Sequence, residues 1–228
     1  TKISKVGCLN MKKKVIIFGS SGDTGKSVIN IFKKRKWDVI SFSRKNTKDR
    51  KNIKLNFDNK IEFENKISQV FKKNKNINTV INCIGFWQST DDNYWNKAMI
   101  KTNLELADNI IRSTLKFINK KKPARFITIS SLDSIYLNTN AFEYSVAKSG
   151  LRTLCKLYQK KFRKTKINFD LITPGAIHSR QRSHKKEKKN ELVQCKQIAE
   201  LCYLIAETNY NLTYEEILLR PKKFEYQL

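Results

Sequence analysis

A chain of 228 residues is long enough to bury one sizeable hydrophobic core without disulfides or metals, so we expect a single domain. Its formal net charge of +27 suits a nucleic-acid partner, but the lysines are scattered through nearly every segment and no nucleic-acid-binding motif accompanies them. We therefore expect solvated surface lysines and no nucleic-acid partner.

The five cysteines have neither paired spacing nor a C-x-x-C pattern, which predicts no disulfide framework and no metal site. No apolar run reaches the length of a membrane span, and no charged-then-apolar leader is found, so we expect no membrane association and no signal peptide. These features favour a cytoplasmic protein. We expect residues 1–10 to be an extension or a disordered N-terminus, and residues 11–228 to form the domain.

Short apolar runs alternate with helical patterns along the chain. The runs predict strands at residues 15–18, 39–42, 53–57, 79–84, 126–129, 169–172 and 217–219. Helical spacing predicts helices that open after Gly25, carry Ile61, Ile67, Val70 and Phe71, and span about 95–119 and 142–163. This alternation predicts an α/β fold, a Rossmann-type doubly wound parallel sheet of about seven strands in a single domain. We expect residues 176–195, which have no clear pattern, to form a functional or mobile loop.

The first predicted strand and helix are joined by the sequence Gly-Ser-Ser-Gly-Asp-Thr-Gly. Glycines in such a turn let a pyrophosphate approach the backbone amides at the helix N-terminus. An ordinary turn is the alternative, but the strand before and the helix after favour a dinucleotide site. The predicted cofactor-binding residues are Gly19, Ser21, Gly22, Asp23, Thr24 and Gly25.

The second predicted strand ends at Ser43, Arg44 and Lys45. A carboxylate there would bind the ribose 2′-hydroxyl of NAD, whereas a cation accepts the 2′-phosphate of NADP. We therefore predict NADP, bound by Ser43 and Arg44; NAD stays open, because two more surface charges would look the same. The fourth strand ends in a glycine that would let an adenosine ribose approach, at the residues Asn82, Cys83, Ile84 and Gly85.

Ser131 follows a predicted strand, and Tyr144 and Lys148 lie four residues apart on one face of the next predicted helix. An adjacent ammonium lowers the tyrosine pKa from its usual value of about 10 by favouring the phenolate. Tyr144 would then serve as the general acid while the Ser131 hydroxyl holds the substrate oxygen. A helix surface pair is the alternative, and the predicted cofactor turn favours catalysis.

With Asn103 and Pro174-Gly175, these motifs resemble the short-chain dehydrogenase/reductase family, small single-domain branch, from about Met11 to Pro221. The resemblance implies that Ser131, Tyr144 and Lys148 are catalytic and that Lys148 also binds the nicotinamide ribose. It further implies that Asn103 completes a water-linked proton relay. The residues that it places beside the nicotinamide are Pro174, Gly175, Ile177 and Ser179.

The family reaction is hydride transfer between NAD(P)(H) and a carbonyl or alcohol carbon of a small substrate, and family members commonly form homo-dimers or tetramers. The Gly-x-x-Gly-x-x-Gly spacing resembles the sugar-nucleotide branch instead, so a nucleotide-sugar epimerase or dehydratase is one alternative. A non-catalytic dinucleotide-binding regulator is another. A cationic loop would suit an anionic substrate or be merely solvated; its residues are His178, Arg180, Arg182, His184, Lys185, Lys186, Lys188 and Lys189.

Overall fold

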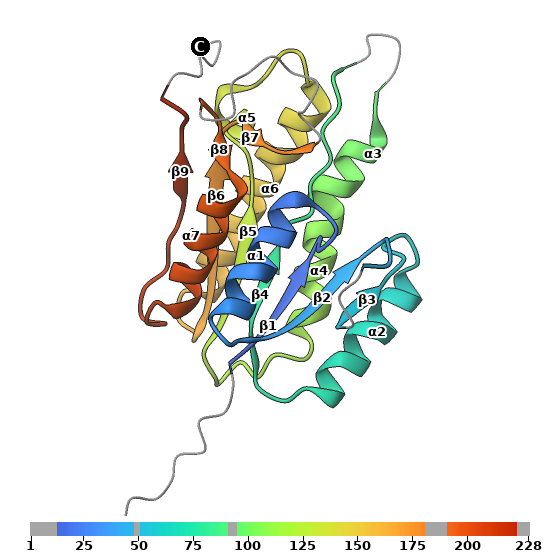
Figure 1. Cartoon of the computed structure of the whole chain (residues 1–228), viewed down its shortest axis with the longest axis vertical. Coiled ribbons are helices and arrows are strands. Elements are labelled where there is room, and N and C mark those ends of the chain that lie inside the picture. Colours follow the sequence, from blue (N-terminus) through green and yellow to red (C-terminus); the bar gives the residue numbers. More distant parts are fainter. Residues whose placement is uncertain (1–12, 48–50, 91–94, 181–190, 223–228) are drawn as a thin grey trace, which may run out of the picture.

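A computed structural model describes residues 13–47, 51–90, 95–180 and 191–222, so the expected extension at residues 1–10 lies outside the described part. Strands and helices alternate along it (Figure 1). The strands are β1 (Lys14–Phe18), β2 (Asp38–Ser43), β3 (Asn52–Lys54), β4 (Ile77–Asn82), β5 (Ala124–Ile129), β6 (Ile167–Pro174), β7 (Ile177–His178), β8 (Val193–Gln194) and β9 (Ile217–Leu219). The helices are α1 (Asp23–Lys34), α2 (Lys60–Lys73), α3 (Lys97–Ile100), the π-helical turn η1 (Lys101–Glu105), α4 (Leu106–Leu115), α5 (Asp133–Tyr136), α6 (Phe142–Phe162) and α7 (Cys195–Glu207).

Seven strands form one parallel sheet in the order β3-β2-β1-β4-β5-β6-β9, which confirms the predicted doubly wound architecture. The chain moves outward from β1 to β2 and β3, and then returns to place β4 on the other side of β1. In sheets of this kind, ligands bind in a crevice outside the carboxyl ends of the strands, at the point where the strand order reverses. The sheet therefore points to its edge beside β1 and β4.

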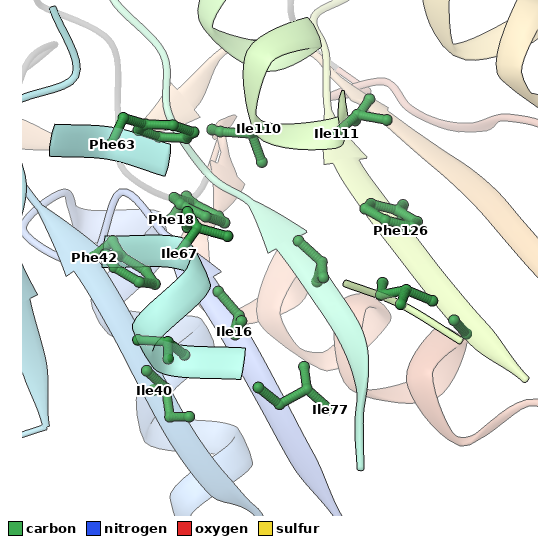
Figure 2. Close-up of a cluster of buried hydrophobic side chains, with 14 of the residues drawn as sticks. Ile16, Phe18, Ile40, Phe42, Phe63, Ile67, Ile77, Ile110, Ile111 and Phe126 are labelled. Carbon is green, nitrogen blue, oxygen red and sulfur yellow. The ribbon is translucent and has the colours of Figure 1, made fainter. Parts of the chain in front are cut away.

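Both faces of the sheet are covered, because successive residues of β1 face opposite layers. Ile16 and Phe18 belong to the core beneath α2, α4 and α6, where Phe18 stacks on Phe42 with ring centroids 4.9 Å apart (Figure 2). Val15 and Ile17 belong to the core beneath α1 and α7. Full burial of such a side chain contributes about 1.5–3 kcal/mol, so the two layers hold the central strands rigidly below the crevice.

The helix predicted over residues 95–119 is interrupted. It consists of α3, the π-helical turn and α4, and Leu106 N donates to Lys101 O across the widened turn. The Asn103 side chain lies within this turn and donates to Met99 O, so a polar group competes with the regular helical ladder. The predicted helix over 142–163 is confirmed within one residue.

Several details differ from the sequence expectations. α1 begins at Asp23 rather than after Gly25, and the helical α5 and α7 were not predicted. Ile61, expected on the apolar side of its helix, is 75% exposed, because Phe63 occupies the buried position. Within residues 176–195, a short parallel ladder joins β7 to β8. No helix in the described part has both the length and the apolar character that crossing a membrane requires.

A buried ion pair holds the approach to β9 against the sheet. Arg125 on β5 and Asp170 on β6 are fully buried and meet at 2.8 Å. The carboxylate also accepts from Tyr214 N at 2.7 Å, and the guanidinium donates to Leu212 O at 2.9 Å and Asn209 O at 3.3 Å. The pair thereby satisfies backbone groups of the segment that leads into the last strand.

Candidate active site

The glycine turn between β1 and α1 is built by close backbone packing. Gly19 has φ +89°, and a Cβ there would lie 2.9 Å from the carbonyl carbon of Cys83. A Cβ on Gly25 would lie only 2.2 Å from Gly19 O, so both glycines are required by the protein itself. At Gly22 a Cβ would meet a single atom, Gly19 O at 3.4 Å, so the space above this residue is open.

The N-terminus of α1 opens into that space. Its N-cap residue is Gly22, which has no side chain with which to cap the first-turn amides of the helix. Uncapped amides at a helix N-terminus bind anions, because they present unsatisfied donors and the positive end of the helix dipole. The open space and the free donors fit the pyrophosphate of a dinucleotide.

A cluster of hydroxyls lies at the end of β2. Asn52 Oδ1, on β3, accepts from the hydroxyls of Ser20 at 2.5 Å, Ser41 at 3.2 Å and Ser43 at 3.2 Å. The Ser43 hydroxyl is also 2.5 Å from Lys45 O, so this side chain is engaged by the protein, whereas Arg44 is exposed. Neither Ser20 nor Asn52 was among the predicted site residues. The available signals were the position of Ser20 within the glycine turn and that of Asn52 directly before a predicted strand.

The end of β4 reaches the predicted catalytic groups. Asn82 Oδ1 accepts from Ile84 N at 3.0 Å and shapes the turn into Gly85. A Cβ on Gly85 would lie 3.7 Å from Asn103 Oδ1 and 3.8 Å from Lys148 Nζ, so these two side chains flank the glycine. Burial raises the pKa of the Cys83 thiol to about 12, which keeps it protonated and unreactive.

Asn103 is buried and makes three hydrogen bonds with the backbone. Its Nδ2 donates to Phe86 O at 2.7 Å and Met99 O at 3.0 Å, and its Oδ1 accepts from Phe86 N at 3.1 Å. The side chain therefore links the residues that follow β4 to the helical segment formed by α3 and η1. This places it beside Gly85 and Lys148, where its predicted partners lie.

Tyr144 and Lys148 lie one turn apart at the start of α6. Lys148 is 2% exposed; its Nζ lies 5.6 Å from the centroid of the Tyr144 ring and donates to Ile129 O at 3.3 Å. Burial lowers the pKa of Lys148 to about 8. Ser131, two residues beyond Ile129, is 9% exposed, and its Oγ accepts from Asp133 N at 3.2 Å. The Lys148 ammonium is thus buried beside the end of β5, whereas Tyr144 is half-buried.

Glu143 is a buried carboxylate that sequence reasoning missed. It accepts from Thr90 Oγ1 at 3.0 Å and from Asn96 N at 2.8 Å, and it is 1% exposed. Thr90 Oγ1 in turn accepts from Phe142 N at 2.7 Å. These bonds attach the β4–α3 connection to the first turn of α6, next to Tyr144. The available signal was an acidic residue in a first helical turn, which the helix dipole favours.

The end of β6 is held to the residues that follow β5 and to β9 by backbone hydrogen bonds. Pro174 O accepts from Leu132 N and Gly175 N donates to Leu219 O, each at 2.8 Å. Ile177 lies in the β7–β8 ladder, and Ser179 follows it. Of the predicted cationic loop, Arg182, His184, Lys185, Lys186, Lys188 and Lys189 lie outside the described residues.

Arg180 contacts the glycine turn. Its backbone N and its Nε each donate to the Asp23 carboxylate at 2.7 Å, and its Nη2 donates to Ser21 O at 3.3 Å. Nearby, Cys195 Sγ lies 3.6 Å from Thr24 Oγ1. Arg180, for which an anionic substrate and solvation were the two alternatives, thus lies over the predicted cofactor turn.

A seven-stranded parallel sheet whose carboxyl edge carries a glycine turn and a buried lysine beside a half-buried tyrosine defines a Rossmann-type fold. No group of three or more His, Cys, Asp or Glu side chains suited to a metal occurs in the part of the chain described. The profile of the short chain dehydrogenases matches residues 13–190. The chain belongs to this family of NAD(P)-dependent oxidoreductases.

Two curated relatives are both named 3-oxoacyl-[acyl-carrier-protein] reductase FabG. The protein of Buchnera aphidicola is 28% identical over 116 residues, which cover 49% of this chain and 47% of the relative. That of Salmonella typhimurium is 28% identical over 88 residues, which cover 39% of this chain and 36% of the relative. The chain therefore spans less than half the length of the curated relatives it matches.

Solved structures share the fold across nearly the whole chain. ElxO with NADP bound has a TM-score of 0.82 at 20% identity, covering 92% of this chain and 97% of that one. Thermoplasma acidophilum aldohexose dehydrogenase in ligand-free form has a TM-score of 0.81 at 16% identity, covering 92% of each chain. Escherichia coli serine dehydrogenase has a TM-score of 0.82 at 14% identity, covering 93% and 100%. Membership of this family favours an oxidoreductase over an epimerase, a dehydratase or a non-catalytic regulator.

Proposed function

We propose that this chain is an NADP(H)-dependent reductase or dehydrogenase acting on a carbonyl or alcohol carbon of a small substrate. One observation carries the proposal: the Lys148 ammonium is buried beside both the Tyr144 ring and Gly85. Burying a lysine without a carboxylate within salt-bridge distance is costly, and such groups cluster at functional sites. We infer that the buried Lys148 ammonium serves to favour the phenolate of Tyr144, the proposed general acid.

The chain's own residues would carry the proton. Because burial lowers the Lys148 pKa only to about 8, the amine is still largely protonated near pH 7. Its charge favours the Tyr144 phenolate and so brings the phenol closer to a useful pKa. The Ser131 hydroxyl would hold the substrate oxygen while Tyr144 gives or takes its proton. The nicotinamide, when bound, supplies or accepts the hydride.

The preference for NADP rests on charge at the end of β2. The acidic residue of this strand, Asp38, lies at its other end, with Lys14 and Lys51 as ion-pair partners. The end toward the crevice carries the exposed Arg44 and Lys45 instead, and a guanidinium suits a 2′-phosphate. We propose that Arg44 makes this contact.

A fluorescence titration of the purified protein with NADPH and NADH tests the cofactor. We expect tighter binding of NADPH, and Arg44→Ala should remove most of the difference; Lys34→Ala, at the far end of α1, is the charge-matched control. Binding of neither cofactor would refute the proposed function. Tighter binding of NADH would refute the role of Arg44 alone.

Turnover of a carbonyl panel with NADPH tests the substrate class. The FabG relatives act, by their name, on acyl-carrier-protein substrates, so a β-ketoacyl thioester belongs in the panel beside simple aldehydes and ketones. Oxidation of the matching alcohols with NADP⁺ gives the preferred direction. Turnover of no member in either direction would contradict the proposed activity.

We propose a homo-dimer or tetramer in the cytoplasm. Large apolar side chains are exposed along α6, at Phe142, Val146 and Leu157, and on β9 at the sheet edge, at Leu218. Such side chains in a row favour a protein partner. The described cysteines are free, which suits a reducing compartment. Light scattering after size exclusion measures the oligomeric state, and a monomer at micromolar concentration would contradict it.

A further inference from the structure

The first turn of α1 contains a carboxylate where the proposed cofactor requires an anion site. Asp23 is the first residue of the helix and follows Gly22, the residue with open space above it. A carboxylate favours a helix N-terminus in isolation, but it repels a pyrophosphate that must occupy the same place. A dinucleotide therefore binds well only if this charge is neutralised.

Arg180 supplies the neutralising charge. Its Nε meets Asp23 Oδ1 at 2.7 Å and its backbone N meets Oδ2 at 2.7 Å, so both carboxylate oxygens are engaged from a residue 157 positions away. Its Nη2 donates to Ser21 O at 3.3 Å, which places the guanidinium over the glycine turn. The Asp23 side chain is 25% exposed and that of Arg180 is 68% exposed.

The position of this segment does not depend on the Arg180 side chain alone. Cys195 Sγ lies 3.6 Å from Thr24 Oγ1 and 3.4 Å from His178 O, a contact that also joins the segment to α1. The β7–β8 ladder holds His178 against Gln194. Removing the guanidinium should therefore remove a charge while leaving the backbone close to Asp23.

We propose that Arg180 is a positioning residue of the cofactor site, an inference that rests on the proposed function. Arg180 neutralises Asp23, and the first turn of α1 can then bind the pyrophosphate of a dinucleotide. Arg180 then acts on cofactor affinity rather than on recognition of an anionic substrate. The Arg180–Asp23 ion pair thereby couples the loop after β6 to the electrostatics of the glycine turn.

A double-mutant cycle on the dissociation constant for NADPH, measured by fluorescence, tests this pairing. Arg180→Ala should weaken binding by roughly 10-fold, the lower end of what a hydrogen bond to a charged group contributes. Asp23→Asn alone should tighten NADPH binding, because the repelling carboxylate is removed while the Arg180 charge remains. The double variant should bind within about threefold of the wild type, because no carboxylate then remains to be neutralised. Arg180→Lys should retain part of the affinity.

Lys196→Ala is the matched control. It removes an exposed cation from the first turn of α7, beside Cys195, and should not change NADPH affinity. Circular dichroism establishes that each variant is folded. Unchanged affinity in Arg180→Ala would overturn the inference, and so would a double variant as weak as Arg180→Ala. Failure of the wild type itself to bind NADPH would instead refute the proposed function, so the two failures are distinguishable.

Discussion

The side-chain amide of Asn103 and the backbone of Phe86 are joined in both directions, at 2.7 Å from Nδ2 to the carbonyl and 3.1 Å from the amide to Oδ1. The two residues lie on either side of the β4–α3 connection. Their pairing fixes the route by which the chain leaves the sheet and enters the helical segment formed by α3 and η1. The position of Gly85 against Lys148 depends on this route.

Asn103→Ala should therefore destabilise the protein. The substitution removes three hydrogen bonds from the side chain to part-buried backbone groups of Phe86 and to the buried carbonyl of Met99, which should cost about 1–3 kcal/mol in the free energy of unfolding. Urea denaturation measures the loss. Lys120→Ala, at an exposed position beyond α4, is the control and should change stability by less than about 0.5 kcal/mol. Equal effects at the two positions would contradict the prediction.

Two glycines of the turn should respond differently to alanine. Gly25→Ala forces a methyl to 2.2 Å from Gly19 O, and such overpacking should cost about 3 kcal/mol in unfolding free energy. Gly22→Ala places its methyl in open space, so the fold should persist. NADPH affinity should nevertheless fall by about 10-fold or more, because the methyl occupies the anion site. Undiminished binding by Gly22→Ala would place the pyrophosphate elsewhere.

Removal of the Tyr144 hydroxyl should abolish chemistry while sparing cofactor binding. Tyr144→Phe should lower kcat/KM by about 10²–10⁴, the usual contribution of a general acid. Steady-state kinetics and a parallel NADPH titration check both parts. Tyr158→Phe is the control on the same helix, since its hydroxyl donates to Asp108 rather than toward the crevice. A similar loss of turnover in both variants would indicate damage to α6.

Lys148 should cost stability in exchange for function. Its folded-state pKa of about 8 lies below the unfolded value of 10.5, so burial of the charged amine destabilises the folded state. This penalty is absent above pH 10.5, grows as the pH falls from 10.5 toward 8, and is complete below pH 8. Lys148→Met should therefore be more stable than the wild type at pH 7, by about 3 kcal/mol, and inactive. Denaturation from pH 7 to 10.5 should show the difference shrinking as pH rises. A constant difference would contradict the pKa shift.

The Arg125–Asp170 pair should be among the most sensitive polar contacts. Asp170→Asn leaves a buried guanidinium without its counter-charge, which should cost about 3–5 kcal/mol. Arg112→Met breaks the Arg112–Asp108 pair, where the arginine side chain is 65% exposed, and should cost less than about 1 kcal/mol. Denaturation midpoints at fixed pH compare the two, and similar losses would refute the distinction.

Local patterns predicted the sheet well. The central strands β1 and β2 contain short apolar runs, and burial of both faces explains why these runs are continuous rather than alternating, whereas the edge strands β3 and β9 are less buried. The glycine turn and the Tyr144–Lys148 spacing were readable for the same reason, since each lies within a few residues. α7 was not predicted although its buried residues have helical spacing, because the unpatterned basic segment before it obscured where it begins.

Contacts between distant residues could not be predicted. The bond from Arg180 to Asp23 spans 157 positions, and the bond from Glu143 to Thr90 spans 53. Nothing near Arg180 distinguishes it from the neighbouring cations, so its partner became visible only once β6 and α1 had been placed at the same edge. The π-helical turn was hidden likewise, because it depends on Phe86 offering its backbone to Asn103.

The buried Arg125–Asp170 pair also bears on the order in which the molecule assembles. Its two members come from β5 and β6, so it completes only when those strands have paired. Before β5 and β6 pair, Asp170 does not yet hold the Arg125 guanidinium in position to bind the carbonyls of Asn209 and Leu212. β9 should therefore dock last in refolding, and its amides should be the last of the sheet to gain protection from hydrogen exchange.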